Sequence, residues 1–331
     1  MKLTPDDIKQ RILKALLTLE RPSGATQVGA VLRGWGLSLS DRSIRLYLLQ
    51  LDAAGCTELK SRRHGRVLTP SGRNEAAKQD VLERMAFVSG QIDELNYRMG
   101  FHLQNGKGTL VVNTTLLSSG AVEEVIRIIR PVFAARLGMG TRVALLKAGA
   151  VYDLQHGSVV PEGKVALLTI CSVTLNGILL KEGIPVTSRF GGLMEFKDHV
   201  PQRFVELLEY GGTTQDPLEL FIRAHMTSVR KCAQTGFGVV GASFREFPSV
   251  ALPEVLKIRE QLKKMGLNGI VAIGSPNQPL YGLPVSEGRT GLVLLGGLNP
   301  VAALEESGVE NMNRSLAGLM EYGRFSEFHY L

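Results

Sequence analysis

Cysteines are few in this sequence of 331 residues, and long hydrophobic runs are absent. The three cysteines, Cys56, Cys171 and Cys232, are widely spaced and form no C-x-x-C pair, which argues against a disulfide framework and against a zinc ribbon. No stretch of about 18 uncharged apolar residues occurs, so we expect no membrane span. The start of the chain, MKLTPDDIKQRIL, resembles a charged amphipathic helix and lacks the apolar region of a signal peptide. Together these absences predict a cytoplasmic protein.

Motifs for catalysis and metal binding are also missing. The six histidines show no metal-ligand spacing, and the chain has no Walker A loop, no G-x-S-x-G and no G-x-G-x-x-G after a strand. Cys171 could be a thiolate near a positive helix end, although a cysteine that closes an apolar strand is more often an inert part of the core. We therefore expect no enzyme, no metal and no cofactor.

Basic charge is concentrated in the first quarter of the chain. Residues 1–78 contain 14 Lys and Arg against 7 Asp and Glu, whereas the remaining residues contain 24 of each kind. The whole formal charge of +7 therefore belongs to residues 1–78. A basic module joined to a neutral body is typical of a nucleic-acid-binding domain attached to a domain with another task.

The pattern of residues 1–78 predicts a winged helix-turn-helix. Apolar positions at helical spacing indicate helices over 8–19 and 25–34, and Ser40 can cap a third that Gly55 ends. A strand, a basic turn and a second strand follow in residues 56–70. Three helices and a basic hairpin are the elements of a winged helix, whose third helix enters the major groove of duplex DNA.

The residues expected to contact DNA lie on the third helix and on the wing. Arginines at these places can reach guanine edges or phosphates. The alternative is a winged helix that contacts only proteins. The expected DNA-binding residues are Arg42, Ser43, Arg45, Tyr47, Arg62, Arg63, His64 and Arg66.

A connecting helix is predicted next, in residues 79–104, because apolar residues recur there at alternating spacings of three and four. This pattern resembles a short a/d seam that could pair two copies into a homodimer, as a palindromic operator requires. The alternative is that the same apolar side lies on the rest of the chain. The seam consists of Val81, Met85, Val88, Ile92, Leu95 and Met99.

The body, residues 105–331, contains an internal duplication over about 106–210 and 236–325. Each half reads strand, helix, strand, strand, helix, so we expect an α/β (α+β) fold of two βαββα halves with mixed sheets and a pseudo-two-fold axis. The alternative is chance similarity between glycine-rich sequences. Agreement of the offsets between the halves at several places favours duplication.

The stretch Ser172–Gly192 is the candidate binding site of the body. It follows an apolar strand, and Asn176 is expected to cap the helix that begins there. Thr187–Gly192 then reads as a cationic, glycine-rich loop. Helix N-termini and such loops bind carboxylates or phosphates, although a tight turn beside a core helix is the simpler interpretation. In the second half Asn299 is expected to be the equivalent cap, with Pro300 in the first turn.

Several strings resemble a known family. The segments SDRSIRLYLLQLDAAG and LTPSGRNEA resemble the winged helix named after ribonuclease R. The body is similar to the NrpR nitrogen-regulatory repressor family in the strings VTLNGILLKEGIPVTSRFGGLMEF, FVELLEYGGTTQDPLELFI, MTSV, IGSPN and GGLNPVAALEESGVE. Some members carry two regulatory bodies in one chain, whereas this sequence has room for one.

The resemblance implies a repressor that binds double-stranded operator DNA as a dimer and responds to 2-oxoglutarate, a small dicarboxylate effector. The alternatives are an RNA-binding regulator and, third, an enzyme acting on a small carboxylate. Arg189 is the residue expected to pair with an effector carboxylate. The expected effector-binding residues are Cys171, Thr174, Asn176, Gly177, Ser188, Arg189, Phe190, Gly191, Gly192 and Asn299.

Overall fold

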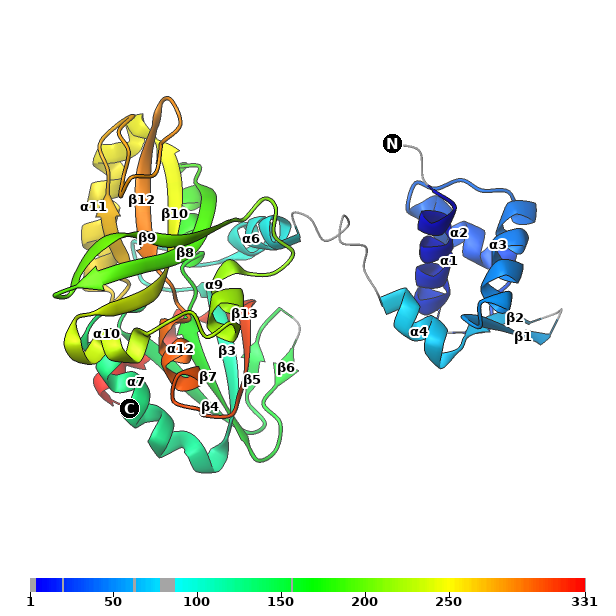
Figure 1. Cartoon of the computed structure of the whole chain (residues 1–331), viewed down its shortest axis with the longest axis horizontal. Coiled ribbons are helices and arrows are strands. Elements are labelled where there is room, and N and C mark those ends of the chain that lie inside the picture. The colour runs from blue at the N-terminus through cyan, green and yellow to red at the C-terminus, as the bar shows by residue number, and fades with distance from the viewer. Residues whose placement is uncertain (1–3, 20, 62–63, 78–86, 156, 331) are drawn as a thin grey trace. The chain divides into compact units, whose positions relative to one another are not determined.

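The computed structural model describes the chain except for residues 1–3, 20, 62–63, 78–86, 156 and 331. It forms two compact units, Met1–Glu83 and Arg84–Leu331, which we call the head and the body (Figure 1). Among the described residues, no helix is both long enough and apolar enough to cross a bilayer.

The head contains the three helices and the hairpin that its sequence predicts. Ser40 caps the third helix, because its Oγ accepts the N–H of Ser43 at 3.1 Å. Apolar residues three and four apart on the helices, such as Ile44 and Leu48, form the core of the head. The elements are α1 (Pro5–Leu19), α2 (Ala25–Gly34), α3 (Asp41–Ala53), β1 (Thr57–Ser61), β2 (Gly65–Leu68) and α4 (Pro70–Ala77).

The body repeats one order of elements twice, which confirms the predicted βαββα halves. Each copy then adds a further strand. The first copy is β3 (Thr109–Ser118), α7 (Val122–Ala134), β4 (Arg142–Lys147), β7 (Lys164–Ile170), α8 (Thr174–Lys181) and β8 (Thr187–Lys197). The second is β10 (Gly238–Pro248), α11 (Leu252–Lys264), β11 (Ile270–Ile273), β12 (Arg289–Leu295), α12 (Asn299–Glu305) and β13 (Asn311–Glu321).

The remaining elements connect and flank the two copies. They are α6 (Phe87–Arg98), η1 (Ser119–Ala121), β5 (Val151–Asp153), β6 (Ser158–Val159), β9 (Val200–Glu209), α9 (Pro217–Arg223), α10 (Val229–Thr235), η2 (Ser249–Ala251), η3 (Tyr322–Arg324), β14 (Ser326–Glu327) and η4 (Phe328–Tyr330).

The two copies exchange their last strands. β13 of the second copy pairs with β3 of the first, and β8 of the first copy pairs with β10 of the second. One sheet therefore has the order β13-β3-β7-β4-β14 and the other the order β11-β12-β10-β8-β9. Because each sheet includes a strand from the other copy, the two halves form one compact unit around a shared apolar core.

All strand pairs between described residues are antiparallel, so the expectation of mixed sheets is wrong. β3 and β4, which α7 connects, do run parallel, but β7 lies between them and is antiparallel to both. β12 separates β10 from β11 in the same way. Each half is thus a split βαβ unit. The order of strands across a sheet is set by tertiary packing, which the strand–helix–strand pattern does not encode.

The connecting helix attaches to the body through the apolar side predicted as a dimer seam. Val88, Ile92, Leu95 and Met99 are all buried in the shared core of the body, while Val81 and Met85 lie outside the described residues. The helix also ends earlier than predicted, at Arg98. For the described part of the helix, the interpretation as a dimer seam is wrong. The same apolar spacing is also found in helices that pack against their own domain.

Candidate functional site

The third helix of the head presents cations to solvent. Arg42 and Arg45 are exposed on α3, and neither side chain bonds to another described residue. Leu46 and Leu49 are exposed on the same helix. Ser43 and Tyr47 are less available for contact with a ligand. Ser43 bonds to the capping Ser40, and Tyr47 packs on the core of the head. The exposed surface of α3 therefore combines two arginines with two leucines.

The wing is described only in part, since Arg62 and Arg63 lie outside the described residues. His64 is exposed at the tip, with its Nδ1 2.8 Å from the Oγ of Ser61. The side chain of Arg66 already has a partner within the head, because its Nε donates to the Oδ2 of Asp52 at 2.7 Å. That ion pair ties β2 to α3, a contact across 14 residues that the sequence pattern did not indicate.

The turn after β7 is built around a buried arginine that sequence reasoning missed. Arg245 of β10 is fully buried. Its Nη1 donates to the carbonyl of Ser172 at 2.8 Å and to the Oδ1 of Asn176, and its Nη2 donates to the Oγ of Ser172 at 2.9 Å. The available signal was a charged pair, Arg245 and Glu246, within the mainly apolar segment 239–247, because a buried cation in a strand requires partners.

Cys171, which closes β7, is a thiol of the core and not a thiolate. It is buried, and this burial raises the pKa of Cys171 to about 12. Gly177 of α8 is also structural, because a Cβ there would come within 2.6 Å of the Cε of Met99. It permits α8 to pack closely on the end of α6. The inert interpretation of Cys171 is thus favoured over the reactive one.

The two asparagines expected as equivalent caps are neither caps nor equivalent. α8 begins at Thr174, so Asn176 lies inside the helix, and Asn299 is the first residue of α12. The structural counterpart of Asn299 is Thr174. The Oγ1 of Thr174 accepts from and donates to the backbone of Val111, both at 3.1 Å, just as the side chain of Asn299 bonds the N–H and carbonyl of Gly241, both at 2.9 Å. Both residues fasten a helix start to a neighbouring strand.

The segment predicted as a cationic loop is the first part of β8. Arg189 does not project into open space there. Its Nη1 donates to the carboxylate of Glu246 at 3.1 and 3.2 Å and to the Oγ of Ser286 at 2.9 Å. The side chain of Arg189 is 33% exposed and that of Glu246 only 2% exposed. Arg189 therefore supplies the counter-charge of a buried carboxylate.

The neighbours of Arg189 have similar structural contacts. Ser188 accepts a bond from the Nδ2 of Asn176 at 3.0 Å, and Phe190 lies 6.3 Å from Phe244 between ring centroids. A Cβ on Gly191 would come 2.6 Å from Pro217, and one on Gly192 would come 2.5 Å from the carbonyl of Glu206. The glycines permit close packing of β8, so the loop prediction is wrong. Contact of these residues with an effector stays a prediction.

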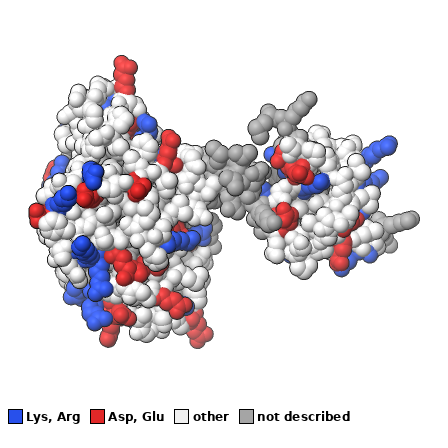
Figure 2. All heavy atoms as spheres, in the orientation of Figure 1, with Lys and Arg blue, Asp and Glu red and all other residues white. Residues whose placement is uncertain are grey.

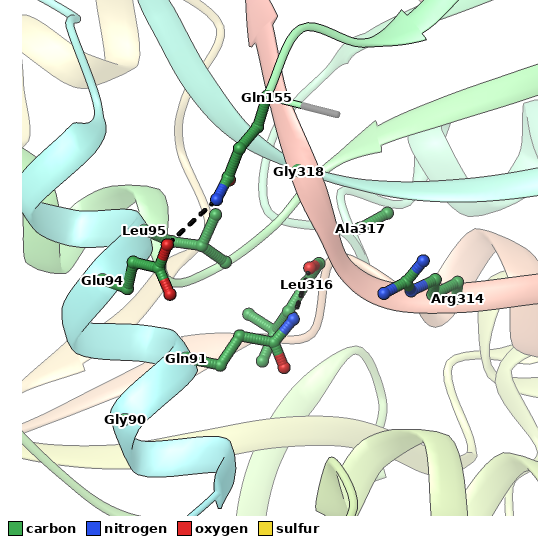
Figure 3. A pocket seen from close by; sticks show the side chains of 9 residues that line it. All are labelled: Gly90, Gln91, Glu94, Leu95, Gln155, Arg314, Leu316, Ala317 and Gly318. Atoms are coloured by element: carbon green, nitrogen blue, oxygen red, sulfur yellow. Dashed lines mark hydrogen bonds between the residues drawn. The ribbon is translucent and has the colours of Figure 1, made fainter. Parts of the chain in front are cut away.

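A cavity of about 380 Å³ lies between α6 and β13, and Figure 3 shows its lining. A second cavity, of about 260 Å³, shares Gln91, Arg314 and Leu316 with it. β13 bulges here, because its register with β3 shifts between Arg314 and Gly318. Leu316 adopts a left-handed φ of 47°, and its carbonyl accepts the Nε2 of Gln91 at 3.0 Å. Helix α6 is thus bonded directly to a strained bulge.

Charges of both signs line these two cavities. Arg314 is exposed and has no polar partner among the described residues. The carboxylates have partners: Glu94 with Arg98 and Gln155, Glu219 with Arg223 and Ser315, and Asp216, the N-cap of α9, with the N–H of Leu218. Three carboxylates around one unpaired guanidinium make a mixed electrostatic environment.

Across the surface of the body, acidic and basic side chains are interspersed on the face shown in Figure 2. A run of basic side chains over α7 and α10 is the exception. This distribution agrees with the balanced charge of the body sequence. Any anion site on the body must therefore arise from a local arrangement and not from an overall field.

The chain is similar to known regulators over most of its length. A family model of the NrpR regulatory domains NRD1 and 2 matches residues 85–327. The global nitrogen regulator NrpRI of Methanosarcina mazei is 32% identical, over 96% of this chain and 96% of that protein. The global nitrogen regulators NrpR of Methanocaldococcus jannaschii and Methanococcus maripaludis are 31% and 29% identical over 77% and 91% of this chain, which spans 40% and 52% of their lengths.

The fold of the body also occurs in a solved structure. The crystal structure of a nitrogen repressor-like protein from Methanococcus jannaschii matches with a TM-score of 0.61 and 23% identity, covering 73% of this chain and 98% of that one. At this sequence identity the match is evidence for the fold alone. The curated relatives are all named as regulators and not as enzymes. The family model and the long match to the Methanosarcina protein show that this chain belongs to the NrpR family of nitrogen regulators.

Proposed function

We propose that the protein is a nitrogen-regulatory transcriptional repressor that binds double-stranded operator DNA through its head and a small dicarboxylate, 2-oxoglutarate, through its body. The observation that carries the DNA-binding part is the pair of exposed, unpartnered arginines on α3. They belong to residues 1–78, the segment that carries all of the net positive charge of the sequence. Exposed arginines on the third helix of a winged helix are placed to contact base edges and phosphates.

Support for the regulatory part comes from the construction of the body. The last described helix before the body sheets, α6, is buried against the shared core and bonded to the bulge of β13. A ligand that changes the body can therefore change the position of α6, which follows the head in the chain. For the ligand to release DNA, it must bind the arrangement of the protein that does not bind DNA more tightly than the arrangement that does. A roughly 100-fold preference between the two corresponds to about 2.7 kcal/mol.

The DNA-binding part is tested by replacing Arg42 and Arg45 with alanine and measuring affinity for a duplex that the protein selects from random DNA. We expect weaker binding with a salt dependence lowered by about one unit for each lost phosphate contact. A matched control replaces Arg127 of α7 with alanine, since that arginine is also exposed but belongs to the body. Equal affinity of the double variant and the wild type would assign DNA binding elsewhere, and preference for structured RNA would indicate an RNA-binding regulator.

A further inference from the structure

The exposed face of α3 carries two leucines beside two arginines. Leu46 and Leu49 are 56% and 57% exposed, and Arg42 and Arg45 are exposed on the same helix. The four residues stand at i, i+3, i+4 and i+7, the spacing that places side chains on one side of a helix. The opposite side of α3 is buried in the core of the head through Ile44, Leu48 and Leu51. The two leucines are therefore not needed for the packing of the head.

The exposed face of α3 includes no carboxylate. The helix has two acidic residues, and each accepts bonds within the head: Asp41 from Thr26, and Asp52 from Thr57 and Arg66. The two exposed arginines have no polar partner among the described residues. Unpaired cations on a helix face are complementary to a phosphate backbone. The occupant of this face is therefore a polyanion, and the leucines must contact an apolar part of it.

The apolar group that duplex DNA offers to a helix in its major groove is the C5-methyl group of thymine. The other groups at the base edges of that groove are hydrogen-bond donors and acceptors. A leucine side chain has neither donor nor acceptor, so against those groups it would exclude water without replacing its bonds. Against a methyl group the same side chain gains the free energy of apolar burial. Two leucines on the face thus favour thymine over the other bases.

The spacing of the face fits a short run of base pairs. Arg42 and Leu49 are seven residues apart, which is roughly 10 Å along a helix, or about three base-pair steps. Leu46 and Leu49 are separated by roughly 4.5 Å of helical rise, so their contacts fall on the same or neighbouring base pairs. Gln50, one turn beyond Leu46, is also exposed, and glutamine pairs well with adenine, the partner of thymine.

We infer that Leu46 and Leu49 recognise thymine methyl groups in the major groove and give the head its preference for A·T base pairs at those positions. Arg42 and Arg45 hold the neighbouring phosphates or guanine edges and fix the helix in the groove. This inference rests on the proposed function, because it requires that the head bind duplex DNA. It goes beyond that function by naming the chemical group that is recognised and the two residues that recognise it.

The test removes the methyl groups from the DNA. The full chain is titrated, by fluorescence anisotropy, with the duplex that it selects from random DNA and with the same duplex carrying 2′-deoxyuridine in place of one thymidine at a time. Uracil keeps the hydrogen-bonding groups of thymine and lacks only the methyl group. We expect binding to weaken by about fourfold for each methyl group that a leucine contacts, the factor expected for burial of one carbon of this size.

The protein variants Leu46→Ala and Leu49→Ala complete the comparison. Each should bind the thymine duplex more weakly and should no longer distinguish thymine from uracil at the position that the leucine contacts. Because both leucines are exposed, the melting temperature should stay close to that of the wild type. Arg42→Ala is a matched control that should weaken binding to both duplexes by the same factor. Leu256→Ala, at a 42% exposed leucine of α11 in the body, should change neither affinity.

Three results would overturn the inference while DNA binding by the head stands. The first is equal affinity of the wild type for the thymine and uracil duplexes at every position, and the second is a selected duplex that requires no thymine. The third is an undiminished preference for thymine in both leucine variants; weaker binding with that preference intact would indicate that the leucines contact protein. If the wild type selects no duplex, the proposed DNA binding falls together with the inference.

Discussion

Single residues in the predicted site have contacts that no local pattern reveals. Arg189 and Glu246 are 57 residues apart in the chain and meet because β8 of one copy pairs with β10 of the other. A short-range signal was more reliable: the predicted cap Ser40 does accept a backbone bond at the start of α3. Asn176 was misplaced by two residues relative to its helix start, and Asn299 was misplaced too, because polar residues at N1 or N3 resemble caps in sequence.

Removal of Arg189 should reduce stability and leave ligand binding intact. In Arg189→Ala the buried carboxylate of Glu246 keeps Ser286 but loses its counter-charge. We expect the free energy of unfolding to fall by about 1–3 kcal/mol, measured by urea denaturation, with unchanged affinity for 2-oxoglutarate. Glu246→Gln is the matched variant, and Arg189→Ala should be less harmful in its background. Lost affinity with unchanged stability would instead support the sequence-based assignment of Arg189 to the effector.

Cys171 should be unreactive in the native protein. Burial raises the pKa of Cys171 to about 12, so the thiolate is essentially absent near neutral pH. Iodoacetamide at pH 8, followed by peptide mass spectrometry, should label the partly exposed Cys56 and should label Cys171 only after denaturation. Labelling of native Cys171 as fast as that of Cys56 would restore the reactive interpretation and, with it, the enzyme alternative.

At the scale of elements, most helices and strands of both units could be predicted from apolar periodicity. The exceptions have physical reasons. Residues 187–192 were assigned to a loop because adjacent glycines are unusual in strands, whereas here Gly191 and Gly192 leave room for Pro217 and for β9. The apolar side of the connecting helix was correctly identified, but its partner was not, because periodicity shows that a face is buried and not what covers it.

The cap of α9 should make stability depend on pH. Burial raises the pKa of Asp216 from 3.8 to about 6. Between these values the native carboxyl holds a proton that the unfolded one has lost, so stability falls as pH rises through this window and the loss is complete above about pH 6. Asp216→Asn keeps a capping oxygen and should remove this contribution. Urea denaturation of both proteins at pH 4.5 and pH 7 should show a smaller decrease in the variant; equal decreases would contradict the assignment.

At the scale of the whole molecule, the duplication was visible in the sequence but the exchange of β8 and β13 was not. Offsets between repeats show that two halves are alike, and they contain no information on which half receives each last strand. The exchange explains why the candidate site residues of one copy contact the other copy, as Ser172 does with Arg245.

The central claim, that a dicarboxylate in the body controls DNA binding by the head, is tested most directly by fluorescence anisotropy. The full chain is bound to a labelled duplex that it has selected from random DNA, and 2-oxoglutarate is then added up to millimolar concentration. We predict that the wild type releases the duplex as 2-oxoglutarate is added. Undiminished DNA binding by the wild type at saturating 2-oxoglutarate would contradict the claim.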